Sequence, residues 1–157
     1  MELPKLGSDS ADYLSSPISE RKTKLTRLFV MPIRRSPEKP GRELTVVWDR
    51  RAPLVEGFDN CYSYLVTFTE KGSFAGNHFH HNKQELFSPV VGSFTVFLEN
   101  VKTKENEEIT LETGQILYIP PNIAHTIISN SEISSLHVSA TYPNNKEDEF
   151  SYPLLRK

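Results

Sequence analysis

The sequence contains a single cysteine, Cys61, and no long run of apolar residues. One cysteine excludes an internal disulfide framework, and its place in the run CYSYLVTF predicts a small buried strand residue rather than a reactive thiol. No segment approaches the roughly 20 apolar residues that a membrane-spanning helix needs. The opening MELPKLGSDS has no apolar stretch behind a basic start, so a secretory signal is not expected. We therefore expect a cytoplasmic protein that does not enter a membrane.

A surplus of charge of one sign is also absent. The 157 residues carry a formal net charge of −2, which does not favour nucleic acid or an anionic membrane as a partner. A small-molecule substrate is the expected partner instead. A chain of this length fits one domain with a sizeable core, and we find no internal repeat and no low-complexity tract.

Helical periodicity is the third feature that the sequence lacks, so long helices are not expected. Short segments rich in β-branched and aromatic residues follow one another, separated by turn signals such as EKGSFAGN, ETGQ and PPN. RRSPEKPGRE is predicted to be a turn-rich loop, and KEDEFSYPLLRK a short helical turn or a wrapping tail. Strands are predicted at residues 27–33, 43–49, 61–68, 86–91, 93–100, 107–111, 116–120, 125–129 and 135–142.

This succession of short strands favours an all-β sandwich or closed barrel, with jelly-roll topology as the leading option. Residues 1–25 are polar and show no sustained periodicity, so they are predicted to be a flexible N-terminal arm. The single domain is then expected to span residues 26–157.

The histidines carry the main chemical signal, because all five fall between residues 78 and 137. On a strand, His78 and His80 point to the same face, whereas His81 points to the other. Glu85 follows after a short excursion that can return the next strand alongside the first, and His125 begins another strand. Three nitrogen donors and one oxygen donor suit a divalent ion such as Zn, Fe, Mn, Ni or Co, with open positions for exogenous ligands.

The spacing of these residues resembles the two sequence motifs of the cupin superfamily. From Gly72 to Gly92 the chain has G, five residues, H, one residue, H, four residues, E, six residues and G, which is similar to the first motif at every position. The stretch that begins at Gly114 resembles the second motif, but Asn122 replaces the usual glycine and Asn130 comes one residue late. Asparagine tolerates the left-handed backbone, so the turn at Asn122 remains feasible.

The resemblance implies a double-stranded β-helix, the cupin jelly-roll barrel, with one divalent transition metal ion held by His78, His80, Glu85 and His125. A hydrogen-bonded polar core without metal is the alternative, since some cupins keep part of this set and bind no ion. The segments LYIPPNIAHTI and SATYPNNKEDEF also resemble cupins that act on nucleotide-linked deoxysugars, namely dTDP-4-dehydrorhamnose 3,5-epimerase and the sugar 3,4-ketoisomerases. GNHFHHNK is similar to the GxHxH segment of the ketoisomerases. Those enzymes generally lack the full ligand set, which favours a metal-dependent relative.

We therefore predict an isomerase or epimerase of a nucleotide-linked keto sugar, in which the ion stabilises charge on the substrate as a Lewis acid. His137 is the candidate general base if its strand faces the pocket. Tyr118 or Tyr142 could return the proton, and Tyr64 is a further possibility. Without metal, the base would be His78 or His80.

Other assignments stay open at this point. Arg50, Arg51 and Lys83 are available as cationic contacts for a pyrophosphate. A centre of three histidines and one glutamate also resembles the iron site of cupin dioxygenases, and a non-catalytic module that binds a small molecule is a third class. A homodimer is expected, since cupin barrels often pair through edge strands and RLFVMPI is compatible with such an exchange.

Overall fold

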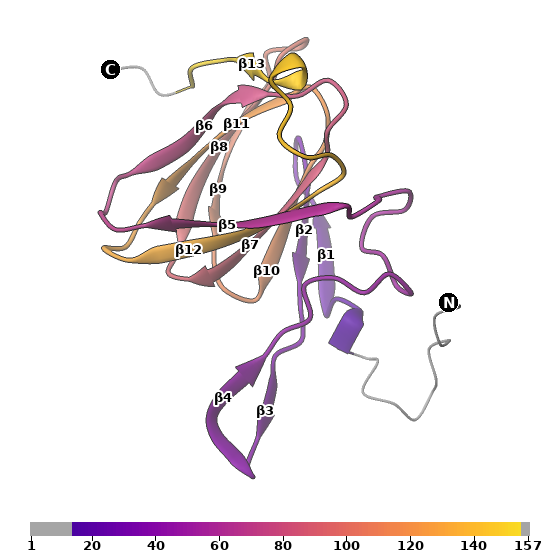
Figure 1. Ribbon diagram of the computed structural model, residues 1–157, viewed down its shortest axis with the longest axis vertical. Coiled ribbons are helices and arrows are strands. Elements are labelled where there is room, and N and C mark those ends of the chain that lie inside the picture. Colours follow the sequence, from indigo (N-terminus) through magenta and orange to yellow (C-terminus); the bar gives the residue numbers. More distant parts are fainter. Residues whose placement is uncertain (1–13, 155–157) are drawn as a thin grey trace.

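The computed structural model describes residues 14–154 as two facing antiparallel sheets and a projecting hairpin (Figure 1). The first sheet has the strand order β1-β2-β10-β7-β12-β5, and the second has the order β13-β6-β11-β8-β9. Their bounds are β1 Ser19–Lys22, β2 Arg27–Val30, β5 Tyr62–Phe68, β6 Phe74–Phe79, β7 Glu85–Val91, β8 Phe94–Asn100, β9 Asn106–Leu111, β10 Gln115–Ile119, β11 Ile123–Ser129, β12 Ser134–Ala140 and β13 Phe150–Ser151. The prediction of an all-β jelly-roll cupin barrel is confirmed.

Helical structure is scarce in the described part of the chain. A short 3-10 helix at Lys146–Asp148 confirms the helical turn expected near the C-terminus. Between residues 14 and 154, no helix has the length and apolar character needed to cross a membrane.

The interior of the barrel is filled by apolar side chains from both sheets. Strand alternation selects them: on β10, Leu117 and Ile119 point into the barrel, while Ile116 and Tyr118 belong to the opposite face. The same alternation sends Phe87 of β7 inward. The inner cluster comprises Leu28, Phe68, Phe87, Phe94, Val96, Leu98, Ile109, Leu111, Leu117, Ile119, Ile123, Ile127, Leu136 and Val138.

A second apolar cluster lies on the outer face of the six-stranded sheet. There the irregular segment 45–60 packs against β2, β7 and β10, using Phe58 and the half-buried Trp48. The rings of Trp48 and Phe58 lie 5.4 Å apart. Part of the outer face is therefore covered, which explains why these strands are apolar on both sides.

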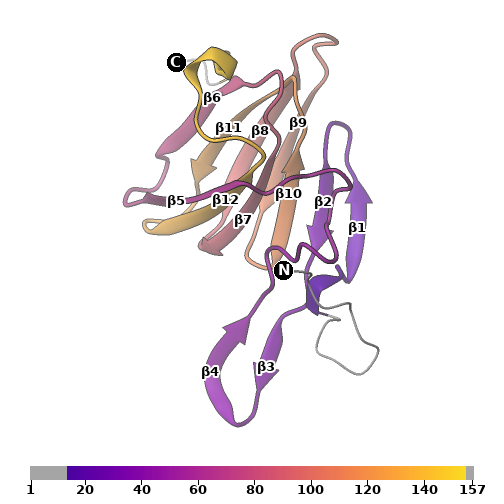
Figure 2. The same cartoon turned by 45° about the vertical axis from the view of Figure 1, so that its right-hand side comes forward.

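Three local predictions about the N-terminal half differ from the structure. The expected loop RRSPEKPGRE forms a hairpin, β3 (Arg34–Ser36) with β4 (Lys39–Leu44), which projects from the barrel in Figure 2. The expected strand 43–49 ends at Leu44, because Val47 and Trp48 turn onto the outer cluster instead. Cys61 precedes β5 and is exposed rather than buried, with its thiol donating to the carbonyl of Thr141.

The N-terminal arm predicted for residues 1–25 falls partly outside the described residues. Within the described part, Ser19–Lys22 forms β1, which pairs antiparallel with β2. The turn between them is held by Glu107, whose carboxylate accepts from the Thr23 hydroxyl and from the main-chain nitrogens of Lys24 and Leu25. This pairing extends the sheet to residue 19.

Candidate metal centre and its surroundings

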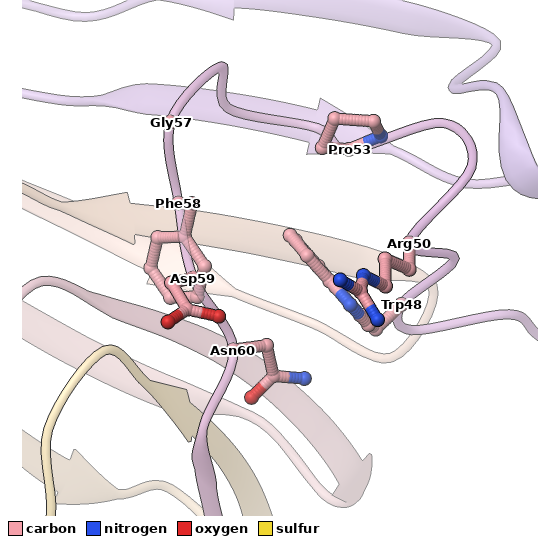
Figure 3. A pocket seen from close by; sticks show the side chains of 7 residues that line it. All are labelled: Trp48, Arg50, Pro53, Gly57, Phe58, Asp59 and Asn60. Carbon is pink, nitrogen blue, oxygen red and sulfur yellow. The ribbon is translucent and has the colours of Figure 1, made fainter. Parts of the chain in front are cut away.

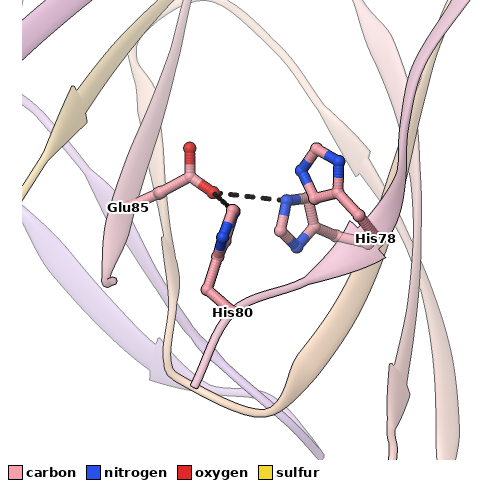
Figure 4. A group of neighbouring side chains, drawn as sticks. His78, His80 and Glu85 are labelled. Atoms are coloured by element: carbon pink, nitrogen blue, oxygen red, sulfur yellow. Dashed lines mark ion pairs between the residues drawn. The ribbon is translucent and has the colours of Figure 1, made fainter. Parts of the chain in front are cut away.

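Four polar side chains converge inside one end of the barrel. His78 lies on β6 with His80 just beyond its end, His125 lies on β11, and Glu85 opens β7 in the opposite sheet. One ligand atom from each lies within 4.8 Å of all the others, and Figure 4 shows the side chains of His78, His80 and Glu85 pointing toward one another. The two cupin motifs therefore meet in one cluster, here called the tetrad.

A bulge in β6 brings His78 to the tetrad. His125 pairs with His78, but Thr126 pairs with Gly76, so Asn77 is the additional residue. Gly76 has φ +106°, and a Cβ atom there would lie 2.5 Å from the carbonyl oxygen of His125. Asn77 has φ 58° and its side-chain oxygen accepts from the Thr126 hydroxyl at 2.6 Å. Only glycine permits this close approach, so Gly76 determines how β6 meets β11.

Glu85 is the centre of the tetrad. Its Oε1 lies 3.3 Å from His80 Nε2 and 3.2 Å from His125 Nε2, while Tyr64 donates its hydroxyl to Oε2 at 3.2 Å. Burial favours the neutral acid, but the contacts with His125 and His80 outweigh it and hold the pKa of Glu85 well below its ordinary value. Burial, and then the Glu85 charge, raise the pKa of Tyr64, so its hydroxyl remains protonated.

Each of the three imidazoles has an oxygen acceptor at Nδ1. These acceptors are the Glu149 carboxylate for His78 at 3.1 Å, the Asp148 carbonyl for His80 at 2.6 Å, and the Ile123 carbonyl for His125 at 3.1 Å. An oxygen atom beside Nδ1 favours the tautomer with the hydrogen on Nδ1, which leaves the Nε2 lone pair to face the tetrad. Metal-binding histidines are oriented by contacts of this kind.

The tetrad therefore brings three nitrogen lone pairs to one carboxylate, an arrangement that needs a positive charge at its centre. A divalent ion or a proton on a histidine can supply that charge. Burial opposes protonation of His80, but the nearby Glu85 carboxylate outweighs it and raises the pKa of His80. Burial, with the nearby His125 and His80, lowers the pKa of His78 to about 4. His80 Nε2 and Glu85 Oε1 are also buried without hydrogen-bond partners, which fits an ion between them.

A cavity of about 50 Å³ adjoins the tetrad, lined on one side by Tyr64, His78, Glu85 and His125. Its other walls are apolar and include Leu136 and Val138. Water occupies about 30 Å³ per molecule in the liquid, so there is room for an ion with one or two small ligands. His78 is the most exposed member of the tetrad, with 24% of its side chain exposed.

The three residues predicted to be catalytic do not join the tetrad. His137 lies between Leu136 and Val138, which line the cavity, so strand alternation directs it to the outer face. Tyr118 is also on the outer face, where its hydroxyl donates to Gln84 at 2.6 Å. Tyr142 follows β12 and is 53% exposed. The further candidate, Tyr64, is the tyrosine that reaches Glu85.

The three cationic candidates occupy different environments. Arg51 binds Asp49, and Arg50 lines an outer pocket of about 410 Å³ with Trp48, Pro53, Gly57, Phe58, Asp59 and Asn60 (Figure 3). Lys83 is buried two residues before Glu85, with its ammonium donating to Asn144 at 3.1 Å. Of the three, Lys83 is the one adjacent to the tetrad.

Sequence reasoning missed Asp148 and Glu149. They lie more than 60 residues from His80 and His78 in the chain, and nothing in the run KEDEF links them to the histidines. Gly76 was also missed, although its position two residues before His78 could have indicated a bulge.

The fold and the tetrad together define a cupin with a candidate centre for a single metal ion. The family model described as FdtA: WxcM-like, C-terminal, matches residues 24–152, and the chain belongs to this family. No curated protein matches the chain by sequence.

Solved structures with the same fold include sugar-nucleotide enzymes. A variant of the 3,4-ketoisomerase QdtA from Thermoanaerobacterium thermosaccharolyticum, in complex with TDP-4-keto-6-deoxyglucose, has 19% identity and TM-score 0.69, covering 83% of this chain and 89% of its own. RmlC from Legionella pneumophila, a dTDP-6-deoxy-D-glucose-3,5-epimerase, has 14% identity and TM-score 0.73, with coverage of 87% and 78%. WlaRA from Campylobacter jejuni, a TDP-fucose-3,4-ketoisomerase, has 18% identity and TM-score 0.65, with coverage of 79% and 87%. At these identities the likeness establishes the fold.

Proposed function

We propose that this protein isomerises or epimerises a nucleotide-linked keto sugar, and that its tetrad holds one divalent transition metal ion. The family and the structural relatives support the substrate class. The observation that carries the metal is the common orientation of the three imidazoles, since an oxygen atom at each Nδ1 leaves every Nε2 free to face Glu85. Zn, Fe, Mn, Ni and Co all accept such a donor set.

A divalent ion in the tetrad would supply Lewis-acid stabilisation of negative charge on a substrate carbonyl oxygen. The protein side chains prepare the site for this chemistry. Glu85 supplies the negative ligand, and Tyr64 holds its second oxygen in place. The apolar walls formed by Leu136 and Val138 keep water away, which strengthens electrostatic interactions in the cavity. The small cavity admits the reacting end of a sugar, and the nucleotide stays outside.

Tyr142 is our proposed proton-transfer residue among the three predicted catalytic side chains. It follows Thr141, whose main-chain nitrogen donates to the carbonyl of Gln84, next to Glu85. Tyr142 therefore lies at the tetrad end of the barrel and is exposed to a substrate outside the cavity. Arg50, Arg51 and Lys83 remain the proposed cationic contacts for the pyrophosphate, and Lys83, the one adjacent to the tetrad, would have to leave its buried contact with Asn144.

The contact between His78 and Glu149 favours a second candidate, in which no ion is used. Glu149 Oε1 lies 3.1 Å from His78 Nδ1, and His78 lines the cavity, which is the arrangement of a histidine oriented as a general base. The lowered pKa of His78 keeps the imidazole unprotonated at pH 7, at the cost of basicity. The same keto-sugar chemistry would then proceed on His78.

A third candidate is a metal-dependent dioxygenase, which would use the same set of three histidines and one glutamate. Redox-active iron, copper or nickel would be required for that activity. The non-catalytic alternative predicts ligand binding without turnover.

The deciding experiment combines elemental analysis with a substrate assay. Wild type and His80→Ala are analysed for metal, and both are incubated with TDP-4-keto-6-deoxyglucose in D2O while NMR follows deuterium incorporation and movement of the keto group. Near-stoichiometric metal and turnover, both lost in His80→Ala, support the proposal. Turnover by metal-free wild type assigns the reaction to His78 as base. Bound iron without turnover of the sugar would favour the dioxygenase, which an oxygen-consumption assay would then test.

A homodimer is the proposed assembly. The hairpin β3–β4 projects from the barrel (Figure 2), and every residue of β4 is exposed in the single chain. Light scattering at micromolar concentration is expected to give twice the mass of the chain, and a monomer there would contradict the proposal.

A further inference from the structure

The C-terminal segment Asn145–Tyr152, here called the strap, crosses the tetrad end of the barrel (Figures 1 and 2). Its strand β13 pairs antiparallel with β6, so that Phe150 is opposite Phe79 and Ser151 is opposite His78. The strap therefore extends the five-stranded sheet beside the strand that carries the first histidine of the tetrad.

Aromatic and polar contacts anchor the strap on both sides of β13. The Phe150 ring stacks on Phe79 with centroids 5.2 Å apart, and the Tyr152 ring meets Phe79 edge-on at 5.8 Å. Tyr152 donates its hydroxyl to Glu99 and accepts from the Lys104 ammonium at 3.0 Å. These contacts leave little freedom to the two residues that precede β13.

Asp148 joins the strap to the turn between β6 and β7. Its carboxylate accepts from the main-chain nitrogens of His81 at 2.9 Å, Asn82 at 3.2 Å and Lys83 at 3.0 Å. Its own carbonyl accepts from His80 Nδ1. Asp148 thus fixes the turn with its side chain and the His80 ring with its main chain.

Glu149 makes the corresponding contact with His78. Its Oε1 lies 3.1 Å from Nδ1, although the Glu149 side chain is 47% exposed and the His78 side chain is 24% exposed. A half-exposed glutamate gains little from an ion pair in water, and a neutral imidazole needs no charged partner. Orientation of the ring is the physical benefit that this contact provides.

We propose that Asp148 and Glu149 are positioning residues, which keep His80 and His78 in the Nδ1–H tautomer and direct both Nε2 atoms into the tetrad. The inference deepens the proposed function and rests on it where metal is concerned. The orientation of His78 is needed equally if that imidazole acts as a metal-free base. The four ligands would then come from the two cupin motifs, and the strap, a third segment of the chain, would orient two of them.

Metal affinity gives the first test. Glu149→Ala, Glu149→Gln and Glu147→Ala are compared with wild type by competition for Zn²⁺ or Mn²⁺ with a chelator. Glu147 has the same charge, lies on the same strap and is also exposed, but of the two only Glu149 contacts a tetrad histidine. Loss of an outer contact to a ligand typically weakens metal binding about 10–100-fold, and this loss is expected for Glu149→Ala but not for Glu147→Ala. Glu149→Gln keeps an oxygen acceptor and should restore much of the affinity.

The His78 tautomer gives a second test that needs no metal. Long-range ¹H–¹⁵N NMR of the metal-free full-length protein is expected to show His78 protonated at Nδ1 in wild type and in Glu147→Ala, and a tautomer mixture in Glu149→Ala. If wild type binds no metal but Glu149→Ala still changes the His78 tautomer, the metal centre is overturned and the positioning role is supported. Equal metal affinity and an unchanged tautomer in Glu149→Ala would overturn the positioning role, whatever the function of the tetrad.

Discussion

The two faces of the six-stranded sheet are built from the same strands but differ in what they bury. On the inner face, β5 and β7 contribute Tyr64 and Glu85 to a polar cluster enclosed by apolar walls. On the outer face, the same sheet carries an apolar cluster under the segment 45–60 together with His137 and Tyr118. The polar groups of the inner face contact one another, whereas on the outer face Tyr118 bonds to Gln84 and His137 Nδ1 is buried without a hydrogen-bond partner.

This difference shows that the chemical role of a titratable side chain on a cupin strand depends on which face of the sheet it occupies. His125 and His137 both lie on interior strands of their sheets, and both follow an apolar residue in the sequence. His125 meets Glu85, Phe87 and His78, while burial without a charged partner lowers the pKa of His137. Substitutions confined to one face are therefore expected to leave the chemistry of the other face unchanged.

The largest expected effect comes from removing one aromatic ring from each face. Phe87→Ala on the inner face and Phe29→Ala on the outer face each delete a ring that is 1% exposed, and each should lower the free energy of unfolding by about 3–5 kcal/mol. Phe87 also packs against His125, with ring centroids 5.6 Å apart. Of the two variants, only Phe87→Ala should therefore weaken metal binding as well as stability. Urea denaturation and metal titration at a temperature where both variants stay folded make the comparison. Equal metal affinity in the two variants would contradict the separation of the faces.

Gly76→Ala is expected to have the next largest effect. The added methyl group would lie 2.5 Å from the His125 carbonyl oxygen, and the residue would have to keep φ +106°. Unfolding free energy should fall by about 1–3 kcal/mol, with a loss of metal binding as His78 moves. Gly41→Ala is the control, because Gly41 also has positive φ but no atom lies within 4 Å of the added Cβ. Similar metal affinities for the two variants would show that the bulge does not place His78.

The tetrad could be predicted from the sequence because its spacing resembles the two cupin motifs, and the two-residue period of a strand puts His78 and His80 on one face. His78 and His80 share a face on any regular strand, and the prediction that His81 turns away agrees with its exposed position and its contact with Asn122. The left-handed turn expected at Asn122 is confirmed by its φ of 65°. Local rules of this kind need no knowledge of distant contacts.

The surroundings of the tetrad could not be predicted in the same way. Strand alternation predicts that His137 points away from the face that carries Leu136 and Val138, but it does not predict which of the two faces lies inside the barrel. The apolar character of those two neighbours was the available signal that His137 points outward. Contacts such as Glu149 to His78 depend on how the C-terminal segment returns to the barrel, which no local pattern encodes.

Tyr64→Phe tests the inner face with the loss of a single hydroxyl. The change removes the donor to Glu85 Oε2 and leaves the ring, so metal binding should weaken about 10-fold with little loss of stability. His137→Ala is the matched control from the neighbouring strand, where His137 pairs with Leu65 and Val138 pairs with Tyr64. Calorimetric metal titration of both variants gives the comparison, and a greater loss in His137→Ala would reverse our assignment of the faces.

The smallest expected effect concerns the outer segment and depends on pH. Asp49 accepts from the Arg51 guanidinium at 2.9 Å and from the Ser15 hydroxyl at 2.7 Å, and the hydrogen bond from Arg51 is the main cause that lowers the pKa of Asp49 from 3.8 to about 2. A lowered pKa stabilises the folded state above the unfolded value, and this contribution disappears as pH falls through the folded value. Asp49→Asn should therefore be less stable than wild type by about 1 kcal/mol above pH 4, with a difference that closes toward pH 2. Urea denaturation across this range measures the gap, while unchanged metal affinity of Asp49→Asn at pH 7 would confirm that the outer segment acts independently of the tetrad.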